Sequence, residues 1–99
     1  MTTHNATPVI LSAVRTPMGG FQGEFSGVTA SQLGAVAIRE AVSRSSLKAD
    51  QIGEALMGNV LPAGVGQAPA RQAALHGGLL EATPCTTVSK VCGSGMKAI

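Results

Sequence analysis

The first apolar residues of the chain form a short and almost uninterrupted run. Residues 8–14 (PVILSAV) have the composition of a strand that is buried on both faces of a sheet. The run ends at residues 15–17, where Pro17 stops strand pairing. The glycine-rich stretch 18–26 is predicted to be a loop that Phe21 and Phe25 hold in place.

A longer amphipathic pattern follows this loop. Thr29 and Gln32 fit a capping box, in which each side chain accepts a hydrogen bond from the other residue's backbone N–H. The helix is predicted to run from this cap to about Leu47. Its solvent face is expected to carry Arg39, Glu40, Ser43 and Arg44, and its buried face Leu33, Val36, Ala37, Ile38, Ala41 and Val42.

The middle of the chain predicts a second strand and a second helix. Residues 52–60 are less regular, but a strand is favoured because the segment is short and glycine-rich turns bound it. Residues 61–67 form a loop. Pro69 suits the first turn of a helix that carries residues 70–75 and stops at the glycines 77–78.

The last stretch, residues 86–99 (TTVSKVCGSGMKAI), predicts a strand, a turn and a helix. β-Branched residues dominate the strand, and the chain turns at residues 92–95 before helix-forming residues resume. The whole chain therefore alternates strand and helix three times. This order predicts an α/β fold, β-α-β-α-β-α, with helices packed on a largely parallel sheet.

Composition supports one folded unit. The 99 residues suffice for a single domain, residues 1–99, and not for two. The apolar share of 44% and the charged share of 12% exclude a disordered, solvating chain. Aromatic residues make up only 2%, so aliphatic residues and methionine must build the core.

Charge and cysteine content exclude several functions. The net charge is +2 and the basic residues are scattered singly, which argues against nucleic-acid binding. No apolar run approaches the ~18 residues of a membrane span. The first residues lack both a signal-peptide core and the arginines of a mitochondrial presequence, which predicts a cytoplasmic protein. Cys85 and Cys92 show no CxxC spacing, so neither a disulfide scaffold nor a zinc site is expected.

Cys92 is the candidate nucleophile. A cysteine at a strand-to-helix turn lies near the first free N–H groups of the helix, whose partial positive charge favours a thiolate over a thiol. Gly93 and Gly95 leave the backbone bare, so a substrate carbonyl can approach both the sulfur and these donors. The alternative is a buried structural cysteine, which is the interpretation given to Cys85.

Two other residues have structural interpretations, and one motif supports an alternative function. His76 lies at a helix end, where contact with the helix dipole or capping is expected, and Lys90 is expected to be a solvated surface residue. Residues 93–98 also satisfy GxGxxG/A after a strand, the pattern of a dinucleotide-binding loop. Against this alternative, the loop comes third in the chain, and the acidic residue expected about 20 positions later falls beyond Ile99.

Residues 89–98 (SKVCGSGMKA) resemble the nucleophile segment of the thiolases, the acetyl-CoA acetyltransferases. The resemblance extends to residues 13–17 with the glycines that follow, to residues 57–61 and to residues 66–72. Ala68 and Ser89 depart from the commoner pattern, which has asparagine at both positions. Thiolases are several times longer, so the chain resembles an incomplete thiolase N-terminal half-domain that ends just after the nucleophile.

The resemblance implies an activity for a full-length protein. Cys92 attacks an acyl-CoA and holds the acyl group as a thioester, and a second acetyl-CoA then yields a 3-ketoacyl-CoA; cleavage is the reverse. Coenzyme A thioesters are substrates, with no metal or bound cofactor, and a homo-oligomer (dimer or tetramer) is expected. The family's catalytic His, second Cys and Asn lie in segments absent here, so the isolated chain is expected to be inactive. A non-catalytic remnant that binds a partner subunit is the alternative.

Overall fold

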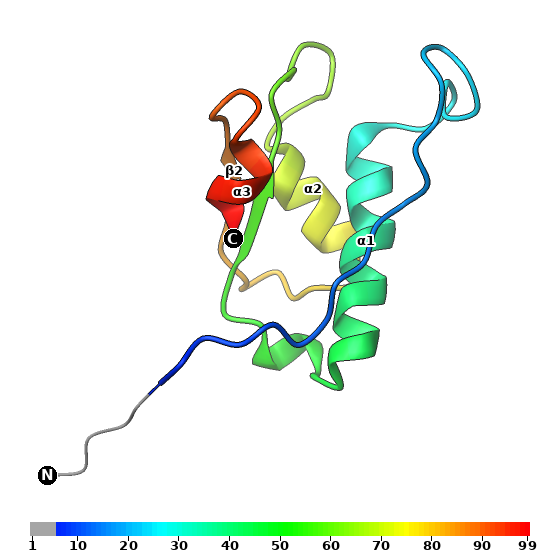
Figure 1. Ribbon diagram of the computed structural model, residues 1–99. Coiled ribbons are helices and arrows are strands. Elements are labelled where there is room, and N and C mark those ends of the chain that lie inside the picture. Colours follow the sequence, from blue (N-terminus) through cyan, green and yellow to red (C-terminus); the bar gives the residue numbers. More distant parts are fainter. Residues whose placement is uncertain (1–5) are drawn as a thin grey trace, which may run out of the picture.

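The computed structural model describes residues 6–99, in which helices pack against a parallel pair of strands (Figure 1). The elements in order are α1 (Ala30–Ser45), the short 3₁₀ helix η1 (Ala49–Gln51), β1 (Ala55–Gly58), α2 (Pro69–His76), β2 (Cys85–Val88) and α3 (Ser94–Ala98). The predicted α/β class with parallel strands is confirmed.

The helix α1 begins at the predicted capping box. Thr29 Oγ1 accepts the Gln32 N–H at 3.2 Å, and Gln32 Oε1 accepts the Thr29 N–H at 2.8 Å. The helix ends at Ser45, close to the predicted end, because Ser46 adopts a left-handed conformation with φ of 63°. Both donors at the start of α1 are thus satisfied locally, as the sequence indicated.

The buried face of α1 differs from the prediction. Ser31 and Ala35 are the buried residues of the helix, whereas Val36 is 53% exposed. The reason is the close approach of α2: a Cβ added at Gly34 would lie only 3.0 Å from the Ala73 Cβ. Small residues permit this approach, so they set which face is buried rather than the largest apolar side chains.

The two strands pair in parallel across the α2 crossover. Ala55 lies opposite Cys85 and Gly58 opposite Val88. Backbone hydrogen bonds extend the pairing at both ends, from Ala55 N–H to Pro84 O at 2.9 Å and from Asn59 N–H to Val88 O at 3.0 Å. Both strands are shorter than the predicted segments 52–60 and 86–91, because the two backbones run side by side only over this register.

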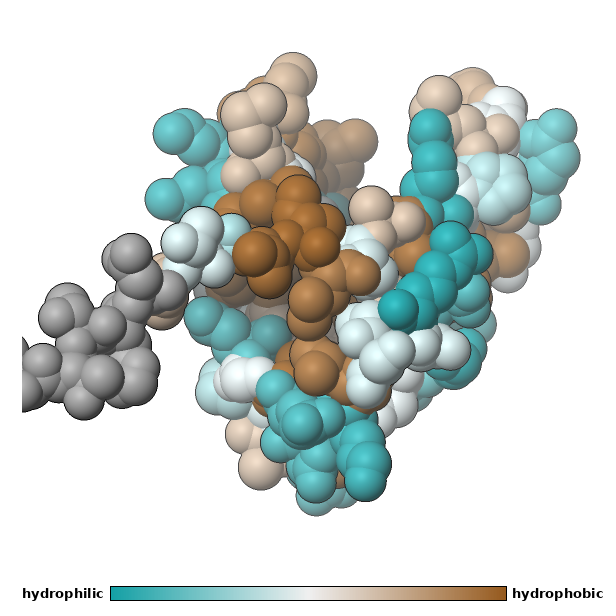
Figure 2. Space-filling view, turned by 60° about the horizontal axis from the view of Figure 1, so that its bottom comes forward, coloured by the Kyte–Doolittle hydropathy of each residue, from teal (hydrophilic) through white to brown (hydrophobic). Residues whose placement is uncertain are grey.

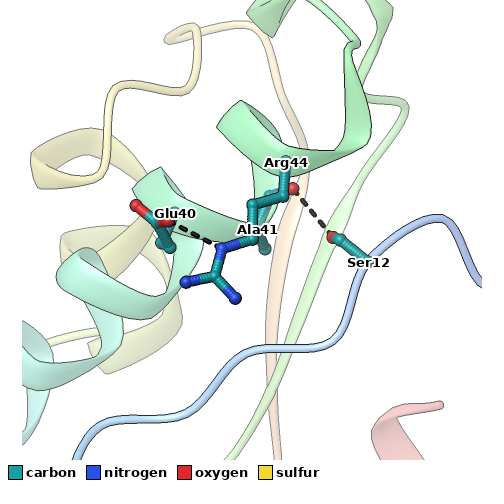
Figure 3. Close-up of polar contacts among 4 residues, drawn as sticks. All are labelled: Ser12, Glu40, Ala41 and Arg44. Carbon is teal, nitrogen blue, oxygen red and sulfur yellow. Dashed lines mark hydrogen bonds and ion pairs between the residues drawn. The ribbon is translucent and has the colours of Figure 1, made fainter.

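The strand predicted at residues 8–14 does not form in the described part of the chain. The segment runs beside α1 without entering the sheet (Figure 1), and Ile10 is 82% exposed. A strand needs a partner backbone, and within the described residues neither β1 nor β2 pairs with this segment. The segment is anchored by Ser12 Oγ, which donates to Ala41 O at 2.8 Å, close to the exposed Glu40–Arg44 ion pair of α1 (Figure 3).

The glycine-rich loop is held by only one of its two aromatic residues. The Phe25 ring is half-buried and packs against Gly19, where an added Cβ would lie 2.9 Å from the ring. Phe21 is 96% exposed, so the prediction is wrong for that residue. Gly20 N–H donates to Glu24 Oε2 at 2.8 Å, and this hydrogen bond lowers the pKa of Glu24.

The buried core of the described residues is small. Its apolar members are five alanines and one leucine: Ala35, Ala55, Ala70, Ala73, Ala74 and Leu79. Larger side chains pack only partly against it, among them Ile38, Val42 and Ile52. Figure 2 shows that apolar side chains outside this small core form an exposed patch on one face of the molecule. The described residues also form a groove of about 540 Å³, whose lining includes Ile10, Met57 and Ile99.

The helix α2 begins at Pro69, as predicted, but the backbone of its N-cap residue is strained. Ala68 adopts a left-handed conformation with φ of 49° and makes no side-chain capping bond. The Ala70 N–H is satisfied instead by Thr87 Oγ1 of β2 at 3.1 Å. A residue without a Cβ would relieve the strain at Ala68.

The substitution Ala68→Gly is therefore expected to stabilise a full-length protein that carries this segment. Relief of left-handed strain, about 1–2 kcal/mol, exceeds the entropy that glycine adds to the unfolded chain, about 0.4–1 kcal/mol. Thermal unfolding should show a higher midpoint. Ala82→Gly, in an exposed turn without positive φ, is the control and should lower the midpoint. Equal shifts in both variants would contradict the interpretation.

Candidate active site

Cys92 lies in a tight turn that joins β2 to α3. The chain leaves β2 after Val88, and the Gly93 N–H donates to Lys90 O at 2.9 Å, which closes the turn. The Cys92 side chain is exposed and belongs to no disulfide. We refer to residues 90–94 as the cysteine turn. The predicted strand-turn-helix order is confirmed, although the strand ends earlier than predicted and the helix starts at Ser94.

The hydroxyl of Ser94 stabilises the cysteine turn through two hydrogen bonds to its backbone. Ser94 is 3% exposed, and its Oγ accepts the Lys90 N–H at 2.7 Å while donating to Val91 O at 2.7 Å. One side chain thus ties together backbone on the N-terminal side of Cys92 and the first residue of α3. The sequence analysis did not single out Ser94; the signal available was a small hydroxyl residue between the two glycines.

Val91, directly before Cys92, has a strained backbone. Its φ is 46°, in the left-handed region, where a β-branched residue is a genuine outlier. Such a conformation costs about 1–3 kcal/mol and persists only where surrounding contacts enforce it. The hydrogen bonds from Ser94 to the backbone of residues 90 and 91 are such contacts. Stored strain beside an exposed cysteine is a feature of functional turns rather than of passive loops.

Cys85, His76 and Lys90 have structural or surface roles. Cys85 is half-buried at the start of β2, packs against the core cluster, and donates from Sγ to Thr83 O at 3.3 Å. His76 is the exposed last residue of α2, and its carbonyl accepts from Arg39 Nη2. The Lys90 side chain is exposed. These positions agree with the core, helix-end and surface interpretations of the three residues.

Residues 6–99 lack two other kinds of feature. No group of three or more His, Cys, Asp or Glu in this part of the chain is placed to hold a metal ion. None of the helices described here combines the length and the apolar character needed to cross a membrane.

The fold and the cysteine turn together define an α/β protein of a known class. Residues 8–99 match the N-terminal domain of thiolase. The chain therefore belongs to the thiolase family, and the fold class expected from the resemblance, an incomplete thiolase-like half-domain, is confirmed.

Individual relatives agree with this assignment. The chain is 56% identical to acetyl-CoA acetyltransferase B, mitochondrial, of Xenopus laevis, over 92% of this chain and 22% of that protein. It is 54% identical to acetyl-CoA acetyltransferase, mitochondrial, of Homo sapiens, over 92% of this chain and 21% of that protein. The crystal structure of Acat5 thiolase from Ascaris suum in complex with coenzyme A superposes with a TM-score of 0.87 at 45% identity, over 90% of this chain and 23% of that one.

The chain thus spans about a fifth of the length of these relatives. The cytoplasmic location predicted from the first residues is contradicted, because the Xenopus and human relatives are named as mitochondrial. That prediction rested on the composition of the first residues alone.

The role of Ser94 leads to a stability prediction. In a full-length protein carrying this segment, Ser94→Ala should lower the free energy of unfolding by about 0.5–1.5 kcal/mol, because the Lys90 N–H and the Val91 carbonyl lose their hydrogen bonds to Ser94 Oγ. Thermal unfolding monitored by circular dichroism measures the change. Ser89→Ala, at an exposed position just before the turn, is the control and should have little effect. An unchanged midpoint in Ser94→Ala would contradict the proposed fastening.

Proposed function

We propose that this chain supplies the acyl-accepting cysteine of a thiolase-type acyltransferase. The observation that carries the proposal is the exposed Cys92 on a strained turn that Ser94 fastens to the start of α3. Membership of the thiolase family supports it, as do relatives named acetyl-CoA acetyltransferase. The same membership favours acyl transfer over the dinucleotide-binding alternative.

In the first step, the Cys92 thiolate attacks the carbonyl carbon of an acyl-CoA. A bond forms between Sγ and the acyl carbon, the bond to the coenzyme A sulfur breaks, and coenzyme A leaves as a thiolate that takes up a proton. Negative charge develops on the carbonyl oxygen during the attack. The Cys92 N–H and the Gly95 and Met96 N–H groups of α3 are the donors that this chain can offer to that oxygen, since the Ser94 N–H donates to Val91 O at 3.2 Å.

In the second step, a second acetyl-CoA loses a proton from its methyl carbon to a base outside this chain. The resulting carbanion attacks the acyl-Cys92 thioester, releases the Cys92 thiolate and forms acetoacetyl-CoA. Thiolysis of a 3-ketoacyl-CoA is the reverse. Coenzyme A enters this scheme within the substrates and not as a resident cofactor.

The whole protein is proposed to be a homo-oligomer, a dimer or tetramer. The apolar side chains that the described residues leave exposed, such as Val9, Ile10 and Leu61, need further protein surface to cover them, from the rest of a full-length chain or from a second subunit.

Acylation of Cys92 is the test of this proposal. A full-length protein carrying this segment is mixed with acetyl-CoA, quenched and digested, and the peptides are analysed by mass spectrometry. We expect one acetyl group on Cys92 and none on Cys85. Cys92→Ser should abolish turnover, because a serine hydroxyl without an adjacent base is a poor nucleophile. Cys85→Ser is the matched control and should retain turnover. Full activity in Cys92→Ser, or acetyl on Cys85 alone, would refute the assignment.

The chain by itself is predicted to be inactive and poorly folded. Alanines dominate its buried core, and large apolar residues such as Ile10 and Leu61 are exposed. Expressed alone, residues 1–99 should show a broad thermal transition or aggregation and should not condense acetyl-CoA. Size-exclusion chromatography, calorimetry and an acetoacetyl-CoA assay measure the three properties. A monodisperse, cooperatively melting chain that condenses acetyl-CoA would defeat the prediction.

A further inference from the structure

We propose that Gly58 is a positioning residue for the cysteine turn, an inference that rests on the proposed function of Cys92. Gly58 is the last residue of β1, and it lies directly against the first turn of α3. A Cβ built at Gly58 would lie 2.8 Å from the Ser94 carbonyl carbon, 2.9 Å from the Gly95 nitrogen and 3.0 Å from the Ser94 Cβ. Two of these three atoms are backbone, so a side chain at this position forces a movement of α3 itself.

Strand pairing between β1 and β2 also fixes the position of Gly58. Gly58 lies opposite Val88 in the parallel register, and the neighbouring Asn59 N–H donates to Val88 O at 3.0 Å. Val88 is also the residue from which the chain leaves β2 toward Cys92. The end of β1 therefore contacts both segments that flank the cysteine turn, the strand before it and the helix after it.

Movement of α3 is transmitted to Cys92 through Ser94. The Ser94 backbone faces Gly58, and its Oγ holds Lys90 and Val91 on the other side of the cysteine. A shift of Ser94 away from β1 must either break these hydrogen bonds or carry the turn with it. The absence of a side chain at Gly58 thus sets where Sγ of Cys92 stands relative to the first N–H groups of α3.

The expected effect of Gly58→Ala is on rate more than on substrate binding. Misplacement of a reacting group by about 1 Å can cost on the order of 10²-fold in rate, so kcat and the rate of Cys92 acylation should fall by about 10- to 100-fold. KM should change by less than about threefold, because the contact between Gly58 and the start of α3 includes no atom proposed to touch the substrate before negative charge develops on its carbonyl oxygen.

Two alanine substitutions at other glycines serve as controls. Gly53→Ala adds the same methyl group where no atom lies within 4 Å, so it should leave kcat unchanged and raise the unfolding midpoint slightly. Gly77→Ala crowds Ala73 O at 2.9 Å and Ile38 Cγ2 at 2.9 Å between α1 and α2. It should lower the unfolding midpoint while leaving Cys92 acylation nearly intact, which separates lost stability from lost positioning.

The experiment measures quenched-flow acylation by acetyl-CoA, kcat, KM and thermal unfolding for these variants in a full-length protein carrying this segment. Ser94→Thr is included in case Gly58→Ala does not fold. It keeps the hydroxyl and adds a methyl group to the Ser94 Cβ, which lies 3.0 Å from a Cβ built at Gly58, so it should show the same fall in kcat at little changed KM.

The outcomes separate this inference from the proposed function. Acylation of Cys92 in the unsubstituted protein, with slow acylation in Gly58→Ala or Ser94→Thr and near-normal acylation in Gly77→Ala, supports the role of Gly58. Normal acylation in Gly58→Ala, or an equal loss in Gly77→Ala, overturns that role and leaves the function of Cys92 standing. Absence of acyl-Cys92 in the unsubstituted protein overturns both.

Discussion

Close approach between backbones is the constraint on which this structure depends. The buried apolar residues are alanines with a single leucine, and the elements meet where side chains are smallest. Gly34 faces Ala73 where α1 meets α2, and Gly58 faces Ser94 where β1 meets α3. Such contacts gain dispersion energy from well-packed backbone atoms, and they tolerate little added volume.

The cysteine turn shows how a packed scaffold can maintain local strain. A left-handed Val91 costs about 1–3 kcal/mol, and each neutral hydrogen bond contributes only about 0.5–1.5 kcal/mol net. The two hydrogen bonds of Ser94 Oγ are therefore of the right size to offset the strain but not to exceed it by much. The packing of α3 against β1 has to contribute the rest, which makes the turn dependent on the sheet as well as on its own sequence.

Local patterns in the sequence predicted what local interactions determine. The capping box at Thr29, the proline start of α2 and the exposed Cys92 between strand and helix all follow from residues close together in the chain. The parallel pairing of β1 with β2 also follows, because a helix connects the two strands.

Features that depend on distant neighbours were not predictable. Residues 8–14 have the composition of a buried strand, but a strand forms only where a partner backbone is available. Val36 belongs to the apolar stripe of α1, yet small residues decide which face α2 covers. Ser94 and Gly58 are ordinary residue types whose roles appear only once the end of β1 is seen against the start of α3.

The contacts that hold the cysteine turn are all uncharged. Ser94 fastens it through a hydroxyl, Gly58 through van der Waals contact, and Gly93 through a backbone hydrogen bond to Lys90. Within residues 6–99, the ion pair of Glu40 with Arg44 lies on the exposed surface of α1. Salt screens exposed charges and leaves neutral, buried contacts almost unaffected. The geometry around the sulfur is consequently expected to change little with ionic strength.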